Sequence, residues 1–129
     1  MLLALLLMIG CPESASPSLV GKWQRVGDDA AGTIVQVEKG DKGYVGKLVV
    51  VFGRLQLIGF KIGELKWKDI EYVDGNRWEG LDSTKIFVGP LLYDNTAFTL
   101  YENGRFLRVE AFNHEPGENG AIQRWKRVP

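Results

Sequence analysis

Short apolar runs separated by turn residues recur along almost the whole chain, and the clearest example is residues 96–112, TAFTLYENGRFLRVEAF. Asn103-Gly104 is the favoured pair for a two-residue type I′ turn, because both central residues of that turn need a positive φ. A loop of this length also fixes the strand register and places Leu100 opposite Leu107. The sequence therefore predicts an antiparallel hairpin at this position.

The two faces of this hairpin differ in polarity, because successive side chains of a strand point to opposite sides. The face expected to point into the core holds Phe98, Leu100, Leu107, Val109 and Ala111. The opposite, mixed face holds Ala97, Thr99, Tyr101, Phe106, Arg108 and Glu110. Sequential hairpins with one apolar face close naturally into a barrel, because closure removes the exposed edges.

The same alternation of apolar runs and turns predicts further strands at residues 19–26, 33–39, 44–52, 55–62, 65–73, 77–83 and 121–128. Together with the hairpin this gives eight or nine strands and no helix. The stretch KIFVGPLLYDN, residues 85–95, is ambiguous, since Pro90 favours an edge or a loop. We expect an all-β fold, a small antiparallel up-and-down β-barrel. A barrel of about eight strands either holds one small ligand or is filled by its own side chains.

Composition limits the class of protein. The 129 residues include 16 acidic and 16 basic side chains, so the net charge is near zero. No block of Lys or Arg stands out, and we therefore expect no nucleic-acid partner. One domain, residues 19–129, is long enough to bury a core. A single cysteine excludes an intramolecular disulfide, so the core alone must stabilise the domain.

The N-terminus, MLLALLLMIGCPES, carries the longest apolar run of the chain. The run at residues 2–9 is much shorter than the roughly 20 apolar residues of a membrane-spanning helix. An apolar stretch that ends in small residues is typical of a secretory signal. We therefore assign residues 1–10 to a signal peptide and residues 11–18 to a flexible Ser/Pro-rich tether.

Met8-Ile9-Gly10 followed by Cys11 resembles the lipobox of bacterial lipoproteins. This resemblance implies cleavage before Cys11, acylation of that cysteine, and anchoring of an exported chain in the cell envelope as a periplasmic or outer-membrane lipoprotein. The alternatives are an ordinary signal peptide with an incidental cysteine and a segment that is not a signal at all. Several acyl chains on one residue would hold the protein firmly in a membrane.

Gly21-Lys22-Trp23 looks like the Gly-x-Trp of lipocalin-like barrels, and two further stretches, YVGKLV at residues 44–49 and QRWKRV at residues 123–128, match the same layout. The whole pattern is similar to the DUF2147 family of small exported bacterial proteins. The resemblance implies a lipocalin-like barrel in which Trp23 closes one end against a basic residue of the last strand, Arg124 or Lys126. That family has no established activity, so the resemblance implies a fold and no function.

Nothing in the sequence points to catalysis or to a cofactor. No Gly-x-Ser-x-Gly motif occurs, and the one histidine, His114, lies between polar loop residues near Glu115 and Glu118. A catalytic zinc usually needs three protein ligands, so we expect no metal site there. The carboxylates in residues 69–82 alternate with Lys66, Lys68 and Arg77 and are expected to be solvated charges on the outer face of the sheet.

Aromatic side chains remain the strongest indication of a site, because ligand pockets combine apolar and aromatic walls with a few polar groups. The candidate ligand-binding residues are Trp67, Trp78, Tyr44, Tyr101, Arg108 and Glu110. We expect a non-catalytic binding module for a small apolar or envelope-derived ligand. The alternative is a structural or protein-interaction module whose barrel is filled by these same aromatic side chains.

Overall fold

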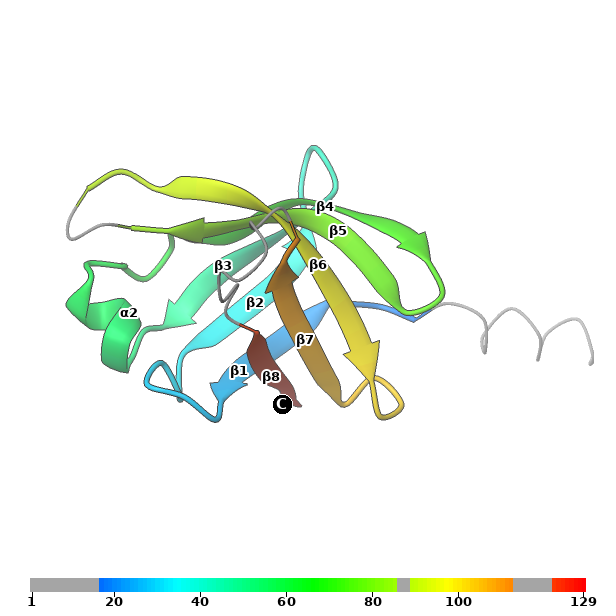
Figure 1. The fold of residues 1–129 in the computed structure, drawn as a ribbon, viewed down its shortest axis with the longest axis horizontal. Helices are drawn as coiled ribbons and strands as arrows, with labels where there is room; N and C mark the ends of the chain where they lie inside the picture. The colour runs from blue at the N-terminus through cyan, green and yellow to red at the C-terminus, as the bar shows by residue number, and fades with distance from the viewer. Residues whose placement is uncertain (1–16, 86–88, 113–121) are drawn as a thin grey trace, which may run out of the picture.

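The computed structural model describes residues 17–85, 89–112 and 122–129, which form a closed barrel of eight antiparallel strands (Figure 1). The elements are β1 (Gly21–Val26), β2 (Ile34–Lys39), β3 (Tyr44–Val50), α2 (Gly53–Leu57), β4 (Leu65–Asp74), β5 (Arg77–Thr84), β6 (Leu92–Tyr101), β7 (Phe106–Ala111) and β8 (Gln123–Val128). Each strand pairs with the next in sequence, and β8 pairs with β1 to close the barrel. The predicted up-and-down, lipocalin-like barrel is confirmed.

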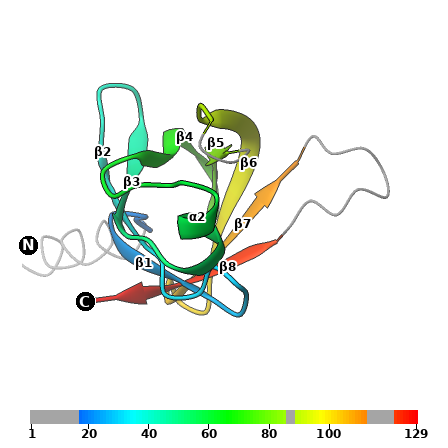
Figure 2. The same ribbon diagram turned by 90° about the vertical axis from the view of Figure 1, so that its left-hand side faces the viewer.

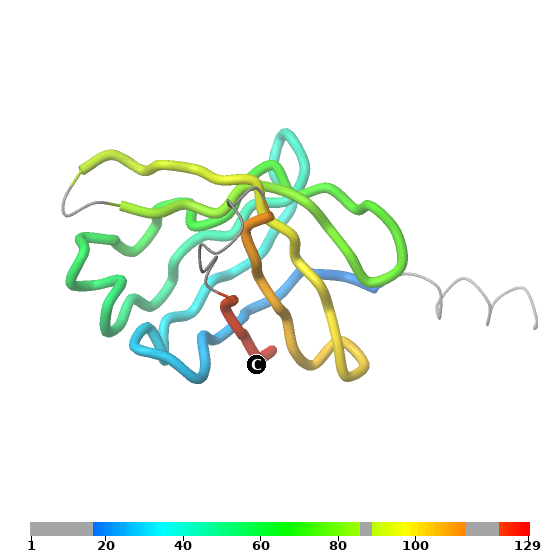
Figure 3. The backbone as a smooth tube through the Cα atoms, in the orientation of Figure 1, coloured from blue at the N-terminus to red at the C-terminus, as the bar shows by residue number. Residues whose placement is uncertain are grey.

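The up-and-down order separates the connections into two groups at opposite ends of the barrel (Figures 1 and 3). The chain enters β1 at the end that also carries the β4–β5 and β6–β7 turns and the last residues of β8; we call this the entry end. The β1–β2 loop and α2 lie at the other, which we call the α2 end. A surface at the α2 end is therefore separated by the length of the barrel from the residues that lead into β1.

The predicted hairpin forms with the predicted register, Leu100 opposite Leu107 and Phe98 opposite Val109. Asn103 and Gly104 have φ values of 58° and 77°, as a type I′ turn requires. Glu102 also has a positive φ, and the Arg105 N–H donates to its carbonyl over 3.2 Å. The apolar face of this hairpin lines the core, with Phe98, Leu107 and Val109 fully buried.

The strand predicted at residues 55–62 is wrong. The helix α2 and a loop occupy this stretch, because Gly53, Gly59 and Gly63 have positive φ values that break an extended strand. Leu55 and Phe60 are buried, and α2 lies across the mouth of the ring of strands (Figure 2). The apolar residues of this segment thus cover one end of the barrel instead of adding to its wall. In the ambiguous stretch that follows β5, Pro90 lies outside the strands and β6 begins at Leu92.

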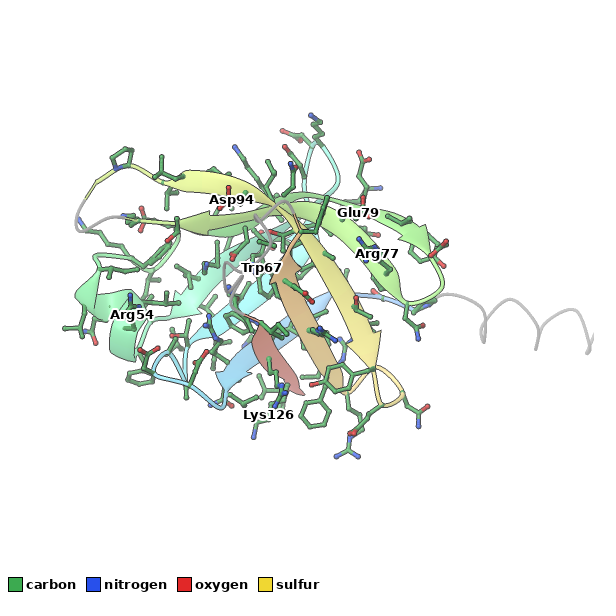
Figure 4. The ribbon with its side chains drawn as sticks, viewed as in Figure 1. Arg54, Trp67, Arg77, Glu79, Asp94 and Lys126 are labelled. Atoms are coloured by element: carbon green, nitrogen blue, oxygen red, sulfur yellow. The ribbon has the colours of Figure 1, made fainter. Side chains whose placement is uncertain are left out.

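Aromatic rings fill the barrel interior. The Trp67 ring packs edge-on against Phe98 and Trp125, with centroids 5.3 and 4.9 Å apart, and all three side chains are completely buried. Figure 4 shows Trp67 among the strands in the middle of the molecule. Gly46 lies opposite Trp67 on β3, where a Cβ atom would come within 2.7 Å of the Trp67 ring. Only the absence of a side chain at residue 46 lets the indole take this place, so the interior is packed around Trp67.

Candidate functional site

The six candidate ligand-binding residues do not line a common cavity. Trp67 is part of the packed core, and Trp78 is buried with its ring edge-on to Tyr72, 5.2 Å between centroids. Tyr44 is half-buried against the core. Four hollows in the described part of the chain are open to solvent, and none is lined by Trp67, Trp78 or Tyr44.

Tyr101, Arg108 and Glu110 lie on the outside of the barrel, so the mixed face of the hairpin does not line an interior cavity as it would for a ligand pocket. Arg108 and Glu110 pair with each other over 2.9 Å, and their side chains are 48% and 40% exposed. The reason is the strand alternation: Leu107 and Val109 take the inner positions of β7, and the residues between them must point outward.

Trp23 lies inside the barrel near the entry end, and its basic partner is Arg127. The predicted partners were wrong, because Arg124 and Lys126 lie on the outer face of β8 while Trp125 and Arg127 lie on the inner one. The Arg127 guanidinium carbon is 4.3 Å from the centre of the Trp23 ring. The resemblance to lipocalin-like barrels thus indicated the correct strand, β8, but residues on its outer face instead of its inner face.

Arg127 also fastens the segment that leads into β1. Its guanidinium donates to the carbonyls of Ser18 and Val20, each over 2.8 Å, and to Gly104 in the β6–β7 turn over 3.1 Å. The Trp23 indole N–H donates to the Leu19 carbonyl over 2.9 Å. Burial lowers the pKa of Arg127. These hydrogen bonds connect the segment that leads into β1, the strand β8 and the β6–β7 turn, and so close the entry end of the barrel.

A buried network of polar side chains, which the sequence did not predict, crosses the barrel near its α2 end. The Lys66 ammonium lies 2.7 Å from Asp82, and the Gln123 amide donates to the other Asp82 oxygen over 2.9 Å. The side chain of Lys66 is only 3% exposed and that of Asp82 15%. Trp125 Nε1 donates to Gln123 over 3.2 Å. The expectation that Lys66 and Asp82 are solvated outer-face charges is wrong, because the Lys66 side chain is buried in the barrel and that of Asp82 largely so, and the Lys66 ammonium lies against the Phe60 ring of the loop that follows α2.

Phe60 sits between two ammonium groups under the α2 end. The Lys66 and Lys85 nitrogens lie 5.2 and 5.6 Å from its ring centre. Lys85 also pairs with Glu64 over 2.8 Å. Burial raises the pKa of the Glu64 carboxyl, but the hydrogen bond and charge of Lys85 and the Lys61 N–H outweigh it, so the pKa lies below its ordinary value. The arrangement is a set of satisfied ion pairs.

The carboxylates of β4 and β5 do not form a catalytic pair. Asp82 is held inside by Lys66, whereas Glu79 lies on the outer face of β5 and pairs with Arg77 over 2.8 Å (Figure 4). Within residues 17–85, 89–112 and 122–129, no three His, Cys, Asp or Glu side chains cluster as metal ligands would. Cys11 and the group His114, Glu115 and Glu118 lie outside the described residues.

Two kinds of surface remain as candidates for binding. At the α2 end, Phe52, Leu57 and Ile62 expose 52%, 84% and 71% of their side chains. On the outer faces of β7 and β8, open grooves of about 480 Å³ each run beside Phe106 and Lys126 and beside Arg108 and Arg124. The first surface is apolar and the second is basic and aromatic.

Comparison of the chain with protein-family models, curated proteins and solved structures finds no match in any of the three. The resemblance to the DUF2147 family and to a lipobox therefore stays a prediction that rests on the quoted motifs. No helix in the described part of the chain is both long and apolar enough to cross a membrane.

Proposed function

We propose that this protein is an exported bacterial lipoprotein, acylated at Cys11, whose filled barrel is a rigid scaffold that binds a protein partner. The observation that carries the proposal is the packing of Trp67 against Phe98 and Trp125, which leaves the barrel axis occupied by side chains. A ligand inside the barrel would have to displace these rings. The interaction module, and not the ligand carrier, is therefore the function that the geometry supports best.

The apolar group Phe52, Leu57 and Ile62 is the surface that supports partner binding. These side chains lie in and beside α2, whose Leu55 and neighbouring Phe60 are anchored in the barrel. Exposed apolar side chains that gather on an otherwise polar surface mark interaction sites. The group lies at the end opposite the chain entry, where a tether would direct it away from the membrane.

Acylation of Cys11 is tested by the mass of the purified protein and by fractionation of a bacterial host. The lipidated chain carries the mass of the acyl groups and stays with the membranes, and the Cys11→Ala variant leaves them. A variant that remains in the membrane fraction would contradict the anchor.

Native mass spectrometry separates the scaffold from the ligand carrier. The scaffold predicts a bare protein mass and no uptake from a lipid or metabolite extract. An additional mass that disappears on denaturation would restore the ligand carrier and overturn the filled-barrel proposal.

Partner binding is tested by crosslinking in the envelope of a bacterium that naturally makes this protein. We expect defined adducts for the unmodified protein, loss of those adducts in Leu57→Glu/Ile62→Glu, and retention in the control Tyr72→Glu/Val73→Glu, which changes exposed apolar residues near the entry end. Adducts that survive the first double substitution, or that both variants lose, would exclude the α2 end as the binding surface.

A further inference from the structure

The outer surface around β8 is strongly basic although the chain as a whole has no net charge. Five exposed basic side chains on the outer face belong to β1, β7, β8 and the β6–β7 turn: Lys22, Arg105, Arg108, Arg124 and Lys126. We call this group the basic surface. The same elements and turn contain only two acidic residues, Glu102 and Glu110. The excess of positive charge is thus local and lies on one side of the barrel.

The arrangement of the basic surface leaves its charges available to an external anion. Arg108 and Arg124 lie directly opposite each other on neighbouring strands, a like-charge pair that is unfavourable without a counter-charge. Arg108 has Glu110 as a partner, whereas no carboxylate of the described residues lies within 4 Å of Arg124 or Lys126. Figure 4 shows Lys126 pointing away from the barrel. An anionic surface would relieve this repulsion.

Aromatic side chains accompany these charges. The Tyr101 and Phe106 rings stack with their centroids 5.5 Å apart, on the outer face next to Lys126. A groove of about 480 Å³ follows the β6–β7 turn and the end of β8, between Phe106 and Lys126. Basic side chains beside half-exposed aromatic rings are the composition that binds the headgroup region of a membrane.

The chain entry places the basic surface close to the proposed anchor. Pro17 lies in a hollow with Gly104 and Arg127, and Arg127 holds Ser18 by its carbonyl. Five residues separate Cys11 from Pro17, and the six Cα-to-Cα steps between them span about 20 Å at full extension. A tether of this length keeps the effective concentration of the surface at the membrane in the millimolar range.

We propose that the basic surface docks on the anionic headgroups of the membrane that holds the anchor, so that the barrel rests on its β7–β8 side and β8 lies nearer to the bilayer than α2 does. This inference rests on the proposed acylation of Cys11 and adds the orientation of the barrel. Each basic side chain near an anionic surface strengthens binding about fivefold.

The test uses the lipidated full-length protein in vesicles, with energy transfer from a single dye to acceptor lipids. Because acylation occupies the only natural cysteine, an introduced cysteine can be labelled alone: Gln24→Cys, beside Lys126 on the barrel exterior, or Leu57→Cys on α2. In phosphatidylglycerol-containing vesicles we expect stronger transfer from residue 24 than from residue 57. In pure phosphatidylcholine, or in about 1 M salt where screening acts within about 3 Å, the difference disappears.

Charge reversal identifies the surface. Arg124→Glu/Lys126→Glu should abolish the difference in transfer and weaken the docked state at least tenfold. Arg54→Glu/Lys61→Glu, the same charge change on exposed residues at the α2 end, should leave it intact. Equal transfer from the two sites, no dependence on lipid charge, or equal effects of the two double variants would overturn the inference.

The mass of the protein tests acylation of Cys11 independently of the orientation of the barrel. If the mass of the protein shows an unmodified Cys11, the proposed lipoprotein is wrong, whatever the orientation. In that case the chain from residue 11 is prepared with Cys11→Ser and an N-terminal histidine tag. Binding of the tag to nickel-chelating lipids then replaces the acyl anchor. The same difference between residues 24 and 57 supports docking by the basic surface, and its absence refutes it.

Discussion

Arg127 shows how one position decides the contacts of a strand end. A shift of one residue along β8 exchanges the inner and outer faces, so Arg124 and Lys126 stay in solvent while Arg127 reaches the Trp23 ring. Its three hydrogen bonds satisfy backbone carbonyls at the chain entry and in the β6–β7 turn. This single side chain joins segments that are more than 100 residues apart.

Arg127→Ala should lower the free energy of unfolding by about 1–2 kcal/mol, since a charged donor to three carbonyls and a cation–π contact are lost together. Lys126→Ala, its exposed neighbour, should change that free energy by less than about 0.5 kcal/mol. Denaturant unfolding followed by tryptophan fluorescence measures both. Equal losses would show that the Arg127 contacts do not stabilise the entry end.

At the scale of elements, the connection between β3 and β4 is where the structure departs most from the sequence pattern. Its apolar residues resemble a strand, but three glycines with positive φ direct it across the barrel end. A Cβ atom at Gly53 would lie 2.0 Å from the Asp29 carbonyl oxygen, so this glycine permits contact with the β1–β2 loop. Phe60 of this connection lies against the ammonium group of Lys66, which pairs with Asp82.

Asp82→Asn should destabilise the fold by about 3–5 kcal/mol, because it leaves the Lys66 ammonium buried without a counter-charge. Glu79→Gln, which breaks the half-exposed pair with Arg77, should change the free energy of unfolding by at most about 1 kcal/mol. Both are read from chemical unfolding curves. The double substitution Lys66→Met/Asp82→Leu should recover most of the loss, and no recovery would contradict this account.

The lowered pKa of Glu64 predicts a stability change in acid. A folded-state pKa below the unfolded value means that the ionised carboxyl stabilises the fold above about pH 4.3, and that this contribution is lost as the pH falls through the folded-state pKa. Glu64→Gln should therefore be less stable at neutral pH, by about 1 kcal/mol or less, and its stability should fall less steeply in acid.

Unfolding curves between pH 7 and 3 measure this difference, and Lys85→Met is the matched control. With Lys85 removed, Glu64→Gln should have a smaller effect at neutral pH, since the ion pair is already broken. If the losses of unfolding free energy caused by Glu64→Gln and Lys85→Met are fully additive, the stabilising contribution of Glu64 does not come from its ion pair with Lys85.

For the whole molecule, closure of β8 on β1 is the decisive contact. Five residue pairs join these strands, from Lys22 opposite Val128 to Val26 opposite Arg124. Without β8, the strands β1 and β7 would be open edges, and the core would lose Trp125. One end of the closed barrel receives the chain, the other carries the α2 cap and the exposed apolar residues, and the basic surface runs along the β7–β8 side between them.

Deletion of residues 122–129 should abolish the native fold and cause aggregation, because unpaired strand edges associate with one another. Deletion of Pro129 alone should have no such effect, since β8 ends at Val128. Circular dichroism and size-exclusion chromatography distinguish the outcomes. A monomeric, folded product of the longer deletion would show that closure is not required.

The sequence by itself determined the local structure: the turn at Asn103-Gly104, the register of β6 and β7, the approximate positions of all eight strands, and the barrel topology. These depend on neighbouring residues, through positive φ values and the two-residue alternation of a strand. Only the tertiary structure decided that the interior is filled, that Lys66 is buried, and that Arg127 is the partner of Trp23. Each depends on what packs against a strand from a distant segment, such as Phe60 against Lys66 or Gly46 against Trp67. Alternation assigns a residue to a face, but closure and capping determine what that face contacts.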